Sequence, residues 1–130
     1  MESGPGEGKK VWVNKRKVGS AYEKRAGLFL ERQGLTVLCY NFRDRCGEID
    51  IVARDGKTTV FVEVKYRRDR ELGLPEEAVN YRKQKRICRV ADYYRMLHGM
   101  GDFSPVRFDV VAICGEEVRW FQNAFDYVER

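Results

Sequence analysis

The stretch that decides the fold is a pair of short apolar segments, GEIDIVA over Gly47–Ala53 and TTVFVEVKY over Thr58–Tyr66, joined through Asp55-Gly56. Both segments are rich in β-branched residues, which favour strands. An Asp-Gly pair between two such runs is a strong signal for a tight hairpin. The sequence therefore predicts two antiparallel strands, Glu48–Ala53 and Thr58–Tyr66.

Charged residues interrupt both segments, although an unpaired ion in a low-dielectric interior costs several kcal/mol or more. In the second segment Phe61, Glu63 and Lys65 share one face, opposite three valines. In the first segment Glu48 and Asp50 share a face. Charges on a strand that is otherwise apolar indicate a site.

The predicted register brings these charges together. With Asp55-Gly56 as a two-residue turn, Glu63 lies opposite Glu48, and Asp50 is its diagonal neighbour at roughly 7 to 8 Å. Carboxylates this close repel each other unless positive charge lies between them, and a hard divalent cation with oxygen ligands is the natural candidate. A cross-strand salt bridge from Lys65 on a solvated face explains the same residues, and the hairpin alone does not separate the two interpretations.

Alternating elements surround the hairpin. Ser20 is a good N-cap for a helix that ends at Gly34, and Pro75 suits the first turn of a second helix reaching about His98. The predicted core residues of this second helix are Val79, Ile87, Val90, Ala91, Tyr94 and Leu97. Three further strands are expected at Leu35–Phe42, Arg107–Ile113 and Val118–Phe121. The order of elements predicts an α/β fold.

The length and composition of the chain limit the number of domains and exclude some classes of protein. The chain has 130 residues, 43% of them hydrophobic, and a formal charge of +5. We expect one domain over residues 19–123, a basic, loosely ordered N-terminal tail over residues 1–18 and a C-terminal tail over residues 124–130. The longest apolar run, Val110–Cys114, is too short for a membrane span, which predicts a soluble protein with no membrane partner.

The cysteines do not form a metal-binding pattern. Cys39, Cys46, Cys88 and Cys114 are separated by 7, 42 and 26 positions, and His98 is the only histidine. No zinc site is expected from this spacing, and the four thiols are interpreted as buried small side chains. The absence of an apolar leader segment predicts a cytoplasmic protein.

Two basic clusters lie on the expected domain, Lys65–Arg70 and Arg82–Arg89. Alone, such clusters are typical of a solvated helix face. Beside an acidic patch, they predict a track for a phosphate backbone. The candidate nucleic-acid-binding residues are Arg67, Arg68, Arg82, Lys83, Arg86 and Arg89.

The hairpin segments, together with Arg107–Ile113, resemble the YraN-like family of small bacterial proteins. That family is similar to the Holliday junction resolvases and restriction endonucleases of the PD-(D/E)xK nuclease fold. The resemblance covers roughly Gly19 to Ile113. It implies a restriction-endonuclease-like fold, with a mixed central sheet flanked by helices and the site on the antiparallel hairpin.

The resemblance also implies roles for particular residues. Asp50 and Glu63 would bind Mg²⁺ or Mn²⁺, the Val64 carbonyl would be a third ligand, and Lys65 would be the catalytic lysine. Glu23 matches a helical glutamate that adds to the metal or water shell and is a further catalytic and metal-binding candidate. Glu48 is another candidate ligand, second to Asp50.

Several of these residues have structural alternatives. Glu23 can close a capping box with Ser20. Lys83, on the apolar stripe of its helix, either extends its ammonium to solvent or reaches a substrate phosphate. Asp109 on the expected buried strand is interpreted as a local structural partner and not as a metal ligand.

The leading function is metal-dependent hydrolysis of DNA by an endonuclease-like enzyme that prefers structured or branched substrates, with DNA favoured over RNA. One alternative is a nucleic-acid-binding module on a nuclease fold that is catalytically idle alone and needs a partner or a homodimer. Another is an interaction adaptor whose basic helix meets an acidic protein. Family membership implies the fold more securely than the activity.

Overall fold

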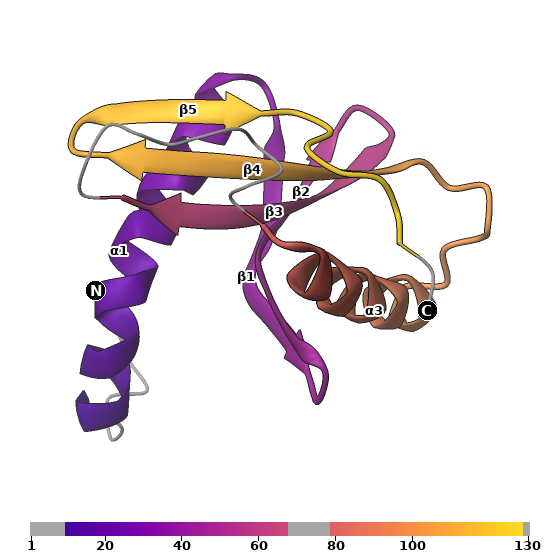
Figure 1. The fold of residues 1–130 in the computed structure, drawn as a ribbon, viewed down its shortest axis with the longest axis horizontal. Helices are drawn as coiled ribbons and strands as arrows, with labels where there is room; N and C mark the ends of the chain where they lie inside the picture. Colours follow the sequence, from indigo (N-terminus) through magenta and orange to yellow (C-terminus); the bar gives the residue numbers. More distant parts are fainter. Residues whose placement is uncertain (1–9, 68–78, 129–130) are drawn as a thin grey trace.

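The computed structural model describes residues 10–67 and 79–128, and it contains one five-stranded sheet with a helix on each face (Figure 1). The strands lie in the order β1-β2-β3-β4-β5; only β3 and β4 are parallel. The elements are α1 (Lys10–Arg32), β1 (Thr36–Asp44), β2 (Gly47–Asp55), β3 (Thr58–Tyr66), α3 (Tyr81–Leu97), β4 (Val106–Cys114) and β5 (Glu117–Phe121). This confirms the predicted mixed α/β architecture. Neither described helix is long and apolar enough to cross a membrane.

The sheet is buried on both faces, which gives the domain two cores. Ala26 and Leu30 of α1 pack on one face, against Ile51, Ala53, Val60, Val62, Val111 and Ile113. Ile87, Val90 and Tyr94 of α3 pack on the other face, against Ile49, Val52, Phe61, Phe108 and Val110. Burial on both faces explains why β3 and β4 are almost continuously apolar.

The β2–β3 hairpin has a different register from the predicted one. Asp55 pairs with Thr58, and Gly56, with φ +62°, takes the first central position of a two-residue loop, where glycine is favoured. The prediction that Glu63 lies opposite Glu48 was wrong. The shift is two residues, which keeps Glu63 and Lys65 of β3 on their predicted face and brings Asp50 level with Glu63. Ile49 and Ile51 pack on opposite faces of the sheet, so the strict alternation expected of β2 does not hold around Asp50.

Helix α1 begins earlier than expected. It starts at Lys10, so Ser20 lies inside the helix, and the prediction that Ser20 caps it was wrong. The capping-box role of Glu23 is wrong for the same reason. A single glycine such as Gly19 costs a helix only about 1 kcal/mol, which is too little by itself to end the helix there. Those residues, expected in a tail, form the first turns of α1.

Helix α3 is shorter than predicted. Its N-cap is Asn80, whose side chain accepts a hydrogen bond from the Lys83 N–H at 2.9 Å. A continuous helix from Pro75 was therefore wrong, and Pro75 itself lies outside the described residues. At the other end Leu97 is 53% exposed, which corrects its predicted place in the core.

The centre of β4 carries a buried carboxylate with a full set of partners. Asp109 is 1% exposed and accepts two hydrogen bonds from Arg107, at 2.9 Å each. It also accepts from the Trp120 indole and the Asn123 N–H. Asp109 thus ties β4 to β5 and to the loop after it, as the sequence interpretation of a local structural partner expected.

The residues after β5 pack back onto the domain. The Ala124 N–H donates to the Phe108 carbonyl at 2.7 Å, and the Phe125 ring stacks on that of Phe108. Tyr127 donates to Asp92 of α3 at 2.6 Å. Residues 124–128, expected in a C-terminal tail, therefore cover one end of the α3 core.

All four cysteines are free thiols. Cys88 and Cys114 are buried, as predicted. Cys39 and Cys46 are only half-buried, so their predicted burial was wrong. Both lie at the β1 edge of the sheet, in β1 and in its turn to β2, where β2 is the only neighbouring strand within residues 10–67 and 79–128.

Replacement of the β4 carboxylate tests its structural role. Asp109→Ala leaves the Arg107 guanidinium and the Trp120 indole without their buried acceptor, so we expect a loss of about 3–5 kcal/mol in the free energy of unfolding. Urea denaturation at pH 7 measures it, and Asp109→Asn should lose less because an acceptor oxygen remains. The exposed pair of Arg119 with Glu117 is the control: Arg119→Ala should cost about 1 kcal/mol or less. Equal losses in the two alanine variants would contradict the assignment.

Candidate active site

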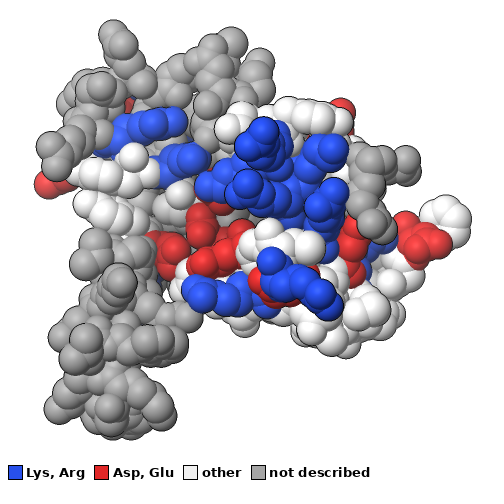
Figure 2. Space-filling view, turned by 60° about the horizontal axis from the view of Figure 1, so that its bottom comes forward, with Lys and Arg blue, Asp and Glu red and all other residues white. Residues whose placement is uncertain are grey.

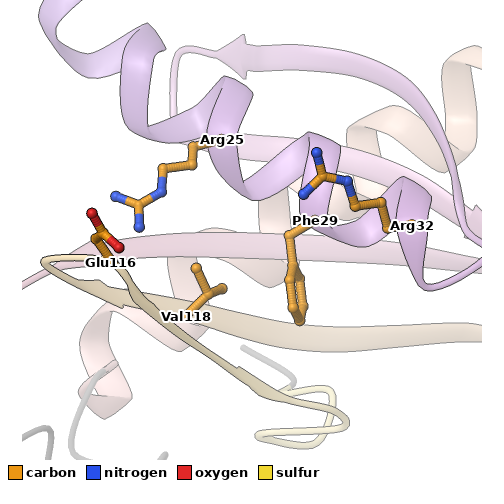
Figure 3. A pocket seen from close by; sticks show the side chains of 5 residues that line it. All are labelled: Arg25, Phe29, Arg32, Glu116 and Val118. Carbon is orange, nitrogen blue, oxygen red and sulfur yellow. The ribbon is translucent and has the colours of Figure 1, made fainter.

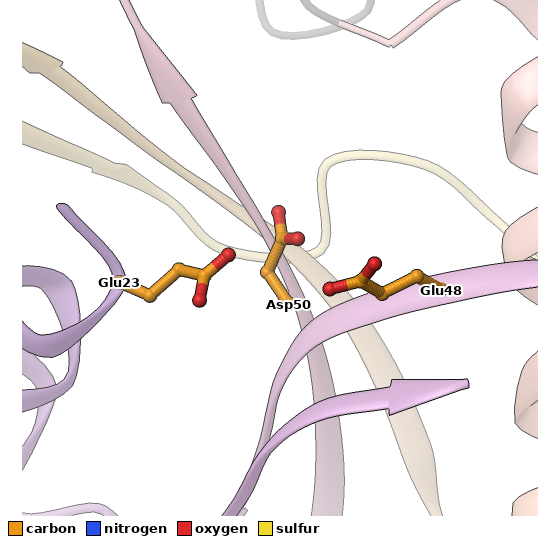
Figure 4. A group of neighbouring side chains, drawn as sticks. All are labelled: Glu23, Glu48 and Asp50. Atoms are coloured by element: carbon orange, nitrogen blue, oxygen red, sulfur yellow. The ribbon is translucent and has the colours of Figure 1, made fainter. Parts of the chain in front are cut away.

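Three carboxylates meet where β2 and β3 separate. The β2–β3 ladder ends at the Ile51–Val62 pair, and Asp50 is the next residue along β2. Oxygens of Glu23, Glu48 and Asp50 all lie within 4.8 Å of one another. Figure 4 shows the three side chains pointing toward one another, with Asp50 between Glu23 of α1 and Glu48 of β2.

Glu23 reaches this group because α1 lies close against β1. A Cβ added to Gly27, one turn further along the helix, would clash with the hydroxyl of Tyr40. The Glu23 Oε1 atom is buried and has no hydrogen-bond partner among the described residues. Burial raises the pKa of Glu23, against which a hydrogen bond from Asn41 acts only in part. A buried oxygen without a hydrogen bond is rare in folded proteins, and a bound ion is one arrangement that accounts for it.

Asp50 is held by the backbone of the neighbouring strand. The Val64 N–H donates to Asp50 Oδ2 at 2.8 Å. This backbone donor, which would otherwise pair with β2, therefore holds the Asp50 carboxylate in place. Burial raises the pKa of Asp50 to about 8, and the nearby charge of Glu63 adds to the rise. Without a cation, the structure therefore favours a protonated Asp50.

Strand β1 supplies a residue that the sequence interpretation missed. Asn41 has φ +55°, a left-handed conformation that asparagine tolerates better than most residues, and its side-chain amide donates to Glu48 Oε2. Arg43 binds the other Glu48 oxygen at 3.1 Å. The sequence feature that could have identified Asn41 is its place as a single amide between two aromatic residues, Tyr40 and Phe42. Its role is to orient Glu48 toward the other two carboxylates.

Glu63 lies beside the three-carboxylate group but is paired with lysines. Its side chain is 5% exposed, and Lys83 Nζ lies 2.6 Å from Oε2. Lys65 Nζ approaches the same oxygen at 3.9 Å. Burial and the charge of Lys83 lower the pKa of Lys65. Burial also acts to lower the pKa of Lys83, but its hydrogen bond to Glu63 outweighs this and raises it.

A cavity of about 190 Å³ connects these groups with α3. It is lined by Gly47, Glu48, Asp50, Glu63, Lys83, Arg86 and Ile87. Acidic side chains from the hairpin thus face basic side chains from the helix across one small space. Such a cavity suits an anionic ligand that is bound through a cation on one side and through lysine or arginine on the other.

Comparison with known proteins identifies the family. Residues 22–113 match the model of "Uncharacterised protein family UPF0102". The chain belongs to this family. A UPF0102 protein of Lachnoclostridium phytofermentans is 47% identical over 114 residues, which cover 88% of this chain and 97% of that protein. A UPF0102 protein of Serratia proteamaculans is 44% identical (88% and 98% covered), and the UPF0102 protein YraN of Salmonella typhi is 42% identical (88% of each chain).

The matched UPF0102 region contains every acidic candidate, and the structure brings all of them together. Glu23, Glu48, Asp50 and Glu63 converge from α1, β2 and β3. Lys65 and Lys83 join them through Glu63. The Val64 carbonyl remains a predicted ligand, while its N–H binds Asp50.

The predicted nucleic-acid-binding residues lie mainly on α3. Arg82, Arg86 and Arg89 are exposed, Arg67 is half-buried, and Arg68 lies outside the described residues. Figure 2 shows lysines and arginines gathered into one patch beside a group of acidic side chains. Arg86 and Lys83 line the same cavity as Glu48, Asp50 and Glu63, and the role of these basic residues in binding nucleic acid stays a prediction.

The acidic group fits a hard divalent ion. All three close side chains offer carboxylate oxygens, the ligands that Mg²⁺ and Mn²⁺ prefer. The Glu23 Oε1 atom has no partner among the described residues, and burial together with the charge of Glu63 raises the pKa of Asp50, so a cation would be favourable here. Glu23, Glu48 and Asp50 are thus the residues that would hold an ion.

A second hollow shows that size alone does not mark the site. It measures about 660 Å³ and lies between α1 and the β4–β5 turn (Figure 3). Its lining is Arg25, Phe29, Arg32, Glu116 and Val118, none of which is a predicted site residue. With two arginines and one carboxylate, it lacks a group of neighbouring acids.

Removal of the Asp50 charge should stabilise the metal-free protein. A carboxyl with a raised pKa contributes stability that is present below its unfolded pKa, near 4, and lost as the pH rises through its folded pKa of about 8. Asp50→Asn stays neutral and can still accept from the Val64 N–H. We therefore expect it to unfold with a free energy about 1–3 kcal/mol higher than the wild type at pH 9, and with little difference at pH 5. Urea denaturation in EDTA at both pH values measures this.

The control is the same chemical change at an exposed position. Asp102 lies in the loop after α3 and is exposed. Asp102→Asn should leave the unfolding free energy within about 0.5 kcal/mol of the wild type at both pH values. A lower stability of Asp50→Asn at pH 9 would show that the buried carboxylate is compensated in the metal-free protein.

Proposed function

We propose that this UPF0102 protein is a nuclease that hydrolyses phosphodiester bonds of DNA with a divalent metal ion, Mg²⁺ or Mn²⁺. The observation that carries the proposal is the group of three carboxylates within 4.8 Å of one another, next to a buried glutamate that two lysines share. The carboxylate oxygens of the structural acid Asp109 all have hydrogen-bond donors, whereas the buried Oε1 of Glu23 has none among the described residues. The resemblance to PD-(D/E)xK nucleases supports the same chemistry. Structured or branched DNA is the substrate that we propose, and the resemblance does not itself supply it.

Glu23, Glu48 and Asp50 would hold the ion. Bound there, a divalent ion neutralises charge on a phosphate and lowers the pKa of a water molecule. The chain's own contribution is to keep the ligands in place. Asn41 orients Glu48, and the Val64 N–H orients Asp50, so two of the three ligands are fixed before substrate arrives.

Lys65 would act on the phosphate. Its ammonium extends from β3 on the face of Glu63 and is three-quarters buried, with 25% of the side chain exposed. In a partly dry site a point charge stabilises developing negative charge better than it does in water. The Lys65 ammonium would thus bind a non-bridging phosphate oxygen as charge builds on it.

The exposed arginines of α3 would bind the DNA backbone on either side of the cut. Arg82, Arg86 and Arg89 lie within two turns of the helix, and Arg86 also lines the cavity with Asp50 and Glu63. Phosphate contacts position a duplex without reading its sequence. The arrangement supports recognition of DNA by shape and charge.

Cleavage tests the proposal directly. Purified protein should nick or cleave four-way or flapped DNA with Mn²⁺ or Mg²⁺, and EDTA should abolish the activity. Asp50→Asn and Lys65→Met should each lose at least about 100-fold in rate, because each removes a group that acts on the metal or the phosphate. Gel assays over a panel of linear, flapped and four-way substrates measure this.

The control for contamination uses the same preparations. Both variants should keep DNA affinity within about threefold of the wild type, since neither residue is on the exposed basic face. Cleavage at the same rate in the wild type and both variants would trace the activity to a contaminating nuclease and refute the site.

A second candidate is a DNA-binding module that does not cleave alone. Its support is the pairing of Glu63 with Lys83 at 2.6 Å, which leaves that carboxylate unavailable as a ligand. A partner or a second copy of the chain would then have to release it. Metal-independent DNA binding, with no cleavage of any substrate, favours this candidate.

Salt dependence tests the binding surface. Replacing Arg86 and Arg89 together by glutamine should reduce the slope of log affinity against log salt by about 2, one for each lost phosphate contact. Fluorescence anisotropy on a 20-base-pair duplex measures the slope. The matched control replaces Arg25 and Arg32 of the second hollow, which removes the same charge elsewhere. Equal changes in slope would show that net charge alone matters, and weak binding even at low salt would favour a protein-binding adaptor.

A further inference from the structure

Two lysines from different elements share one oxygen of Glu63. Lys65 comes from the same strand and lies 3.9 Å from Oε2, whereas Lys83 comes from the first turn of α3 and lies 2.6 Å from it. The tighter contact is thus made by the residue that is farther away in sequence. Lys65 belongs to the Glu-x-Lys motif, but Lys83 has no place in it.

Lys83 supplies positive charge beside the Glu63 carboxylate, as a metal ion bound there would. Glu63 is 5% exposed, and a carboxylate that is buried to this extent stays charged only beside a cation. The group of Glu23, Glu48 and Asp50 has no such lysine contact among the described residues. In the metal-free protein, the cation at Glu63 is therefore the Lys83 ammonium.

The backbone and side chain of Lys83 differ in their constraints. Its backbone N–H is bound by the side chain of the N-cap residue Asn80 at 2.9 Å. Its side chain, by contrast, is 40% exposed. Moving the ammonium from Glu63 toward solvent thus requires only a change of side-chain rotamers, with no movement of α3. The cavity of about 190 Å³ beside Glu63 has room for an ion with several waters.

We infer that Lys83 is a built-in competitor of the divalent ion: its ammonium occupies Glu63 in the metal-free protein and leaves when Glu63 joins the ion's ligands. This inference rests on the proposed metal site. Once released, Lys83 lines the cavity beside Arg86 and faces an incoming phosphate. Lys83 thus compensates the negative charge of Glu63 in the metal-free protein, and its ammonium faces the substrate phosphate when the ion is bound.

Metal affinity tests the inference without any measurement of cleavage. We expect Lys83→Met to bind Mn²⁺ about tenfold more tightly than the wild type, because the ion no longer has to displace a charge-assisted hydrogen bond. Lys83→Arg, which keeps a cation, should stay within about threefold of the wild type. Isothermal titration calorimetry on the full-length protein with MnCl₂ gives the dissociation constants.

Two further variants separate competition from a change in net charge. Arg86→Met removes a cation from the same cavity, and Lys85→Met removes one from the same helix, where Lys85 lies over the Tyr81 ring. Both should change Mn²⁺ affinity by less than about threefold. Tightening in Arg86→Met equal to that in Lys83→Met would overturn the inference in favour of general electrostatics.

The stability of the variants provides a second readout. Lys83→Met leaves Glu63 with only the longer contact to Lys65, so Lys83→Gln, which keeps a hydrogen-bond donor, serves if the methionine variant folds poorly. The rise in melting temperature with saturating Mn²⁺ should be larger in either variant than in the wild type. If the wild type binds Mn²⁺ and Lys83→Met and Lys83→Gln bind it no more tightly, the inference fails and the metal site stands. If no form of the protein binds Mn²⁺, both the inference and the proposed nuclease function fail.

Discussion

The constraint on which the rest of the site depends is the concentration of negative charge between two separating strands. Glu23, Glu48, Asp50 and Glu63 come together in a partly dry region where like charges repel strongly. The fold answers this repulsion in different ways: Lys83 pairs with Glu63, Asn41 binds Glu48, and the Val64 N–H holds Asp50. The buried Oε1 atom of Glu23 receives no hydrogen bond among the described residues.

The architecture explains how such charges can be assembled at all. Apolar contacts on both faces of the sheet hold α1 and α3 in place. The polar groups gather where the β2–β3 ladder stops, next to the first turn of α3. Asp109 in the middle of β4 shows the contrast, because a buried carboxylate inside the sheet is saturated by Arg107 and Trp120. A carboxylate whose oxygens all have hydrogen-bond donors is structural. Carboxylates that lack some of these donors form the candidate site.

Much of this arrangement could be predicted from the sequence, but its long-range details could not. Alternation of apolar residues assigns Glu63 and Lys65 to one face whatever the register, because a shift of two residues keeps the face. The register itself depends on whether Asp55 or Gly56 opens the turn, and the dipeptide does not decide this. The starts of both helices were missed because Ser20 and Asn80 are both residue types that favour N-caps. Ser20 lies inside α1, whereas Asn80 caps α3, and only tertiary packing decides between these two positions. The Lys83–Glu63 contact joins residues twenty positions apart, on different elements, and no periodicity encodes it.

The position of Lys83 gives the site a way to exist without metal. A cluster of buried carboxylates with no cation would favour unfolding or protonation, and the raised pKa of Asp50 shows that protonation meets part of this need. The ion pair of Lys83 with Glu63 meets another part without using Lys65, which stays on its own strand at 3.9 Å. A partner of Glu63 that could not move away would compete with a metal ion for this carboxylate at all times. The Lys83 side chain is long, and its backbone N–H is held by Asn80. The ammonium can therefore leave Glu63 to a metal ion without a change in the fold.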